Sequence, residues 1–138
     1  MKKILLIAAA LLLVLPSVSA QETKDAQKIN KKNLVIKEWN TDAKSKSRIL
    51  DHQTTYSPEG KKLEEIEYGS GGQKWRKRYE YGANGKVSRE LVYDEHNKLQ
   101  TVKKFEYNEF NRKKTQYNYD SKGRLKTMKV FEYIAEDA

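Results

Sequence analysis

Four cationic side chains recur at one place in a repeated pattern, four residues before a tyrosine. They are Lys77, Arg89, Lys103 and Lys129. Aromatic side chains stand two residues before three of these tyrosines, at Tyr79, Phe105 and Phe131. Residues two apart on a β-strand share a face, so the pattern predicts one surface lined by cations and rings. Cations bind anionic groups, and aromatic rings attract cations over their faces.

Two interpretations of this surface stay open at the level of sequence. In the first, the cations and rings form a ligand-binding face suited to an acidic glycan or another anion. In the second, the methylene stems of the cationic residues cover the rings while their charged heads reach water. Each cation–π contact would then stabilise the fold by about 0.5–1 kcal/mol.

The residues suited to catalysis are few and scattered. The chain has no cysteine, and its two histidines, His52 and His96, are far apart in sequence. Neither belongs to a spacing typical of a metal site. Four carboxylates, Glu67, Glu80, Glu106 and Glu132, each precede a tyrosine. We expect them to share a polar face with Arg78, Lys104 and Lys114 and to form cross-strand charge pairs. We therefore predict a non-enzymatic protein with no catalytic residues, no cofactor and no metal ion.

A repeated turn motif must position these residues. Tyrosines 56, 68, 81, 93, 107 and 119 each open one copy, and Tyr133 closes the last. The fourth residue after each opening tyrosine is Gly60, Gly72, Gly85, Asn97, Asn111 or Gly123. Gly and Asn are the residues that most readily adopt positive φ. Ser, Asn or Asp follows four of the six tyrosines, which is typical of a type I turn closed by a residue with positive φ.

Between these turns, side chains alternate with the period of a half-buried strand. We predict an all-β domain over residues 34–138, an antiparallel up-and-down meander of about eight strands. The first two strands are expected at residues 34–39 and 48–56, and no substantial helix is expected after residue 20. We favour a curled open sheet over a small closed barrel, because a sealed barrel would bury several unpaired cations.

The spacing of the tyrosines gives an expectation about faces. The intervals are 12, 13, 12, 14, 12 and 14 residues. Even intervals are expected to keep the tyrosines on one face of the sheet. The single interval of 13, between Tyr68 and Tyr81, predicts a bulge or irregular turn near residues 69–72.

The first twenty residues have the features of a cleavable signal peptide. A basic start at Lys2 and Lys3 precedes an apolar run, and Val18 and Ala20 form a small-residue cleavage site. Residues 21–33 are polar and are expected to be a disordered linker. We predict a periplasmic or secreted protein, not a lipoprotein, with no membrane span after cleavage. Its net charge of +9 falls to +7 without the signal peptide. Export makes nucleic acid an unsuitable partner.

The most complete copy of the motif resembles a known repeat. Residues 119–125, Tyr-Asp-Ser-Lys-Gly-Arg-Leu, are similar to the Tyr-Asp-x-x-Gly-Arg-Leu core of the YD, or Rhs-type, repeats. Residues 93–99 keep the Tyr-Asp, the cation and the Leu, and two further copies match more loosely. The resemblance implies β-hairpins of the kind found in extended β-sheet shells and surface proteins. In overall plan the chain is also similar to small exported bacterial β-repeat proteins of unknown function.

Three functional hypotheses follow from the sequence. The first is binding of an anionic glycan or another acidic ligand on the cation–aromatic face. The second is a structural protein that associates with itself through its sheet edges or aromatic face. The third is an inhibitor or immunity-like partner of a secreted protein.

Overall fold

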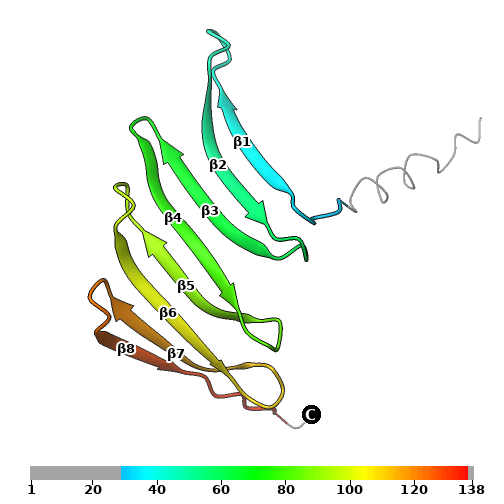
Figure 1. Ribbon diagram of the computed structural model, residues 1–138, viewed down its shortest axis with the longest axis vertical. Helices are drawn as coiled ribbons and strands as arrows, with labels where there is room; N and C mark the ends of the chain where they lie inside the picture. Colours follow the sequence, from blue (N-terminus) through cyan, green and yellow to red (C-terminus); the bar gives the residue numbers. More distant parts are fainter. Residues whose placement is uncertain (1–28, 137–138) are drawn as a thin grey trace, which may run out of the picture.

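The protein forms one antiparallel sheet of eight strands in sequence order, as Figure 1 shows. The computed structural model describes residues 29–136, so the predicted signal peptide and most of the predicted linker lie outside the described residues. The strands are β1 (Val35–Thr41), β2 (Arg48–Tyr56), β3 (Lys62–Gly69), β4 (Gly72–Tyr81), β5 (Val87–Tyr93), β6 (Leu99–Tyr107), β7 (Lys113–Asp120) and β8 (Leu125–Val130). The predicted up-and-down meander of eight strands is therefore confirmed.

The turn chemistry agrees with the sequence. All six predicted positions, Gly60, Gly72, Gly85, Asn97, Asn111 and Gly123, have positive φ. At four of the turns the side-chain oxygen of the residue after the tyrosine accepts two backbone N–H groups. The Asp120 carboxylate, for example, accepts the N–H groups of Lys122 and Arg124, both at 2.9 Å. The Tyr-Asp part of the motif thus closes hairpins.

The bulges of these hairpins decide which face each side chain occupies. Each of the six hairpins between β2 and β8 has a register shift immediately before its tyrosine. The prediction of one bulge near residues 69–72 is confirmed by the shift between Glu67 and Tyr68. The prediction that even spacing keeps the tyrosines on one face is wrong, because a bulge adds one residue and reverses the alternation.

The register makes this reversal visible at two successive tyrosines. Tyr79 lies opposite Glu90, and Tyr81 shares its face by alternation. Tyr93 instead lies opposite Arg76, which is on the other face. We call the face that carries Lys77, Tyr79 and Phe105 face A, and the face that carries Arg76, Leu91 and Tyr93 face B.

The sheet is a single open layer that does not close into a barrel, as predicted. Phe105, 8% exposed, is the one buried hydrophobic residue among those described. Apolar side chains such as Met128 and Val130 remain 54% and 66% exposed. Cohesion therefore depends on backbone ladders and cross-strand side-chain pairs more than on a core. Over residues 29–136, no helix has the length and apolar character needed to cross a membrane.

Candidate functional site

Face A brings together most of the residues predicted to form a ligand-binding surface. Tyr79, Glu90 and Lys103 form one cross-strand row, and Phe105, Gln116 and Lys129 form another. Lys77 joins the first group by alternation with Tyr79 on β4. Phe131 lies just beyond β8, where its N–H donates to the Lys114 carbonyl at 3.1 Å.

Arg89 does not belong to this surface, which corrects the predicted row of four cations. It lies on face B, opposite Glu80 on one side and Lys104 on the other. Its guanidinium contacts the Glu80 carboxylate at 2.7 and 3.1 Å. The physical reason is the bulge at each hairpin, which reverses the alternation of side chains. The residue four places before the tyrosine therefore lies on face A in β4, where it is Lys77, and on face B in β5, where it is Arg89.

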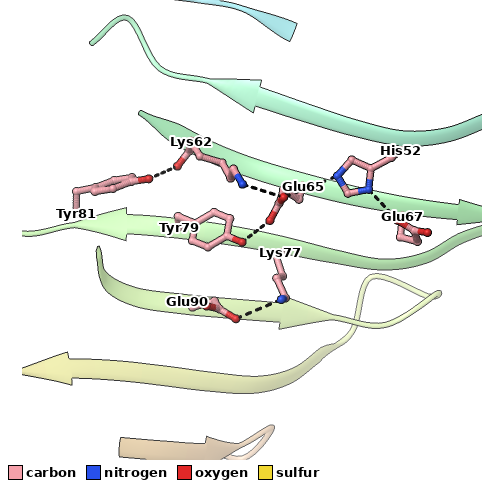
Figure 2. A network of polar contacts seen from close by, with 8 residues as sticks. All are labelled: His52, Lys62, Glu65, Glu67, Lys77, Tyr79, Tyr81 and Glu90. Atoms are coloured by element: carbon pink, nitrogen blue, oxygen red, sulfur yellow. Dashed lines mark hydrogen bonds and ion pairs between the residues drawn. The ribbon is translucent and has the colours of Figure 1, made fainter. Parts of the chain in front are cut away.

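A polar cluster crosses face A from β2 to β4, as Figure 2 shows. We call it the glutamate network, formed by His52, Lys62, Glu65, Glu67 and Tyr79. Glu65 accepts hydrogen bonds from Lys62 Nζ at 3.0 Å and from the Tyr79 hydroxyl. His52 Nδ1 contacts Glu67 Oε2 at 2.7 Å, and His52 Nε2 lies 3.8 Å from Glu65 Oε1.

One residue of the network lies on a different face from the one predicted. Glu67 was expected on the polar face with Arg78, but it lies on face A, opposite His52 and Trp75. The hairpin between β3 and β4 is built differently from the others, with a two-residue connection between the paired Gly69 and Gly72. His52 is a half-buried member of the network with 19% side-chain exposure.

The network shifts the ionisation of its members. Partial burial raises the pKa of Glu65, but hydrogen bonds from Tyr79 and Lys62, together with the charges of Lys62 and His52, outweigh it and lower the pKa overall. The pKa of Tyr79 is raised, first by burial and then by its hydrogen bond to Glu65. The hydrogen bond to Glu65 also raises the pKa of Lys62. At neutral pH the network therefore holds an ionised glutamate, a charged lysine and a neutral tyrosine.

Lys77 and Lys103, both predicted ligand-binding cations, share one carboxylate. Their Nζ atoms lie 3.6 and 3.9 Å from Glu90 Oε1, and the Glu90 side chain is only 15% exposed. Figure 2 shows the Lys77–Glu90 pair beside the network. Glu90 lies between them, so its single negative charge offsets part of their combined positive charge on face A.

A second region of the same face is a hollow between β5 and β7. It is lined by Lys86, Val87, Glu90, Phe105, Tyr107, Asn111 and Lys113, and we call it the lysine hollow. Lys113 Nζ lies 4.5 Å from the centre of the Phe105 ring. The Tyr107 hydroxyl donates to the Val87 carbonyl at 2.6 Å, which fixes this ring against β5. Neither Lys86 nor Lys113 forms an ion pair with another described residue.

The two lysines of this hollow were not among the ligand-binding residues predicted from the sequence. Both follow a residue with positive φ, Lys86 directly after Gly85 and Lys113 two residues after Asn111. The cation that follows most of these turns could be seen in the sequence as part of the repeat. Its place could not be found from sequence because the two turns belong to hairpins 26 residues apart that the sheet sets side by side.

Comparisons with known proteins give little further information. No protein-family model matches the chain, and no curated protein sequence matches it. The resemblance to YD repeats therefore rests on the turn motif alone. The crystal structure of TarM is similar with a TM-score of 0.34 and 11% identity, over 78% of this chain and 23% of that one. This chain thus spans less than a quarter of that protein.

The described residues 29–136 contain no group of three or more His, Cys, Asp or Glu side chains arranged to hold a metal ion. The arrangement on face A is therefore one of ion pairs, hydrogen bonds and rings. Contacts of these kinds are the ones through which a protein surface can bind a charged molecule.

Proposed function

We propose that this protein is an exported, non-enzymatic binding module whose lysine hollow takes the acidic group of a glycan or another anionic ligand. One observation carries the proposal. Lys86 and Lys113 flank the rings of Phe105 and Tyr107 without a carboxylate partner of their own among the described residues. Cations beside aromatic rings suit a ligand that has both a negative charge and a flat apolar surface.

The charge distribution around the hollow supports this choice over the other cations of face A. Glu90 lines one margin of the hollow, and the Nζ atoms of Lys77 and Lys103 lie 3.6 and 3.9 Å from its carboxylate. A carboxylate or sulfate entering there meets Lys86 and Lys113 first. The net positive charge of the whole chain would also attract such a ligand at low salt.

The test is binding of purified protein to acidic and neutral polysaccharides at low and physiological salt, measured by calorimetry. We expect acidic chains alone to bind, with an affinity that falls as salt rises. Lys86→Gln with Lys113→Gln is expected to weaken binding at least tenfold.

A matched control removes one positive charge elsewhere. Lys122→Gln, in the exposed turn between β7 and β8, changes the net charge by one without touching the hollow. Lys113→Gln alone should therefore weaken binding several-fold more than Lys122→Gln. Equal effects of these two single variants, or no binding by the native protein, would refute the proposal.

A further inference from the structure

The sheet is built from four two-stranded units. In three of them the tyrosine that closes the second strand donates its hydroxyl to the first strand of the same unit. Tyr81 reaches the Lys62 carbonyl at 2.6 Å, Tyr107 reaches Val87 at 2.6 Å, and Tyr133 reaches Lys113 at 2.7 Å. The units are β1–β2, β3–β4, β5–β6 and β7–β8, and they join through three similar pairs, β2 with β3, β4 with β5, and β6 with β7.

The two outer strands, β1 and β8, each have one edge that is not paired with another strand. All seven residues of β1 and all six of β8 are exposed. Figure 1 shows β1 and β8 at opposite ends of the sheet. Val35 on β1 is 47% exposed and Val130 on β8 is 66% exposed. Exposed edges of this kind are templates for pairing with another strand.

We propose that a second copy of this chain adds its β1 to β8, so that the meander continues from one molecule to the next through a fourth joint. Strand direction fits this arrangement. The eight strands alternate in direction, so β1 and β8 run antiparallel and a second copy placed beyond β8 presents β1 in the required direction. Repeat architectures extend by the same nearest-neighbour contacts that join their internal units.

The internal joints also define the register. In each of them, the residue before the closing tyrosine lies opposite one fixed position in the next unit. These pairs are Thr55 with Glu64, Glu80 with Arg89, and Glu106 with Thr115. The fixed position is defined by its partner on the other strand of its own unit. That partner is always the residue three places before the tyrosine that closes the unit. The pairs are Glu64 with Arg78, Arg89 with Lys104, and Thr115 with Val130.

Applying this register to β8 produces a complementary pair of charges. The residue before Tyr133 is Glu132. The fixed position in the first unit is Lys37, which lies opposite Gln53, three places before Tyr56. Glu132 of one copy therefore faces Lys37 of the next. The internal joint between β4 and β5 already contains such a pair, with Glu80 and Arg89 at 2.7 Å.

Engineered cysteines test this geometry directly, because the chain has no cysteine of its own. Lys37→Cys with Glu132→Cys places two thiols opposite each other across the proposed joint, within disulfide reach. Mild oxidation is expected to give a ladder of dimers, trimers and longer chains, because a head-to-tail contact does not close. Each single variant is expected to give far less product than the double variant.

A charge swap tests the same contact without crosslinking. Lys37→Glu or Glu132→Lys alone should raise the concentration needed for association on the order of fivefold, since like charges then oppose each other. The two together should restore it. Glu95→Lys, in an exposed turn, makes the same charge change as Glu132→Lys and should not weaken association.

Three outcomes would overturn the inference. They are a strict monomer in sedimentation velocity at all concentrations, failure of the swap to restore association, and equal crosslinking of Glu132→Cys alone, which would mean that β8 pairs with β8. None of them depends on ligand binding at the lysine hollow, so this proposal and the proposed function succeed or fail separately.

Discussion

The glutamate network and the lysine hollow occupy the same face of the same sheet, yet they differ in what their charges do. In the network, Glu65 is bonded to Lys62 and Tyr79, and His52 is bonded to Glu67. In the hollow, two lysines flank aromatic rings and no carboxylate is paired with them among the described residues. The strand scaffold is shared, so the difference comes from the side chains that the strands and turns carry.

The two regions share the same hairpin ends and differ in their other side chains. The hairpin ends are nearly the same throughout, with one tyrosine hydroxyl bond in each of three units. The other side chains vary from unit to unit, and the pairing of strands determines which acids meet which bases. In the network acids and bases pair and stabilise the sheet, whereas the two lysines of the hollow form no ion pair with another described residue.

The largest effect is expected at Phe105, which lines the hollow and is the one buried hydrophobic side chain within residues 29–136. Phe105→Ala removes a ring that is 8% exposed, and we expect it to lower the free energy of unfolding by about 3 kcal/mol. Urea unfolding followed by tryptophan fluorescence measures this. Phe110→Ala is the control, because that side chain is 74% exposed and its loss should change stability by less than about 0.5 kcal/mol. Similar losses for both would show that the ring of Phe105 is not packed.

A substitution at Glu65 should disrupt the glutamate network most, because Glu65 accepts hydrogen bonds from both Lys62 and Tyr79. Glu65→Gln leaves Lys62 and Tyr79 without their carboxylate partner, and we expect a loss of about 2 kcal/mol at neutral pH. Because the folded state lowers the pKa of Glu65, its contribution is fully present above its unfolded value of about 4.3 and is lost as pH falls through the folded value.

The pH dependence of this variant provides its own control. The stability difference between native protein and Glu65→Gln should be greatest above about pH 4.3 and should shrink as the pH falls further. Unfolding curves at several pH values measure it. A difference that stays constant down to pH 2 would mean that the charge of Glu65 does not stabilise the network.

Glu90 lies between the two regions, so removing its charge should raise the affinity of the hollow for an anion and lower the stability of the sheet. Glu90→Gln leaves Lys77 and Lys103 without their shared carboxylate and removes the negative charge at the margin of the hollow. We expect affinity for an acidic polysaccharide to rise several-fold, while stability falls by about 1 kcal/mol. Calorimetry and urea unfolding measure the two effects. Unchanged affinity would place the ligand elsewhere on the surface.

The smallest effects are expected at the hairpin ends, where the two regions are alike. Tyr81→Phe and Tyr107→Phe each remove a hydroxyl bond to a backbone carbonyl, and each should lower the free energy of unfolding by about 1 kcal/mol. The two losses should agree within about 0.5 kcal/mol, since the contacts are equivalent. A much larger loss at Tyr81 would show that the glutamate network extends to the end of β4.

The sequence alone determined the turns and therefore the number and order of the strands. Gly or Asn four residues after each tyrosine supplies the positive φ, and a preceding Asp, Asn or Ser accepts the turn's N–H groups. These are local interactions within a few residues, so they can be read along the chain. β2 was predicted at its observed limits, and β1 within two residues of them.

The tertiary structure alone decided which side chains meet. Each bulge reverses the alternation, which moved Arg89 to face B and left Lys77, Lys103 and Lys129 on face A. The carboxylate between Lys77 and Lys103 and the pair of lysines beside Phe105 arise from neighbouring strands whose register depends on those bulges. One residue of register changes the face of every side chain in a strand, so local sequence could not determine the site.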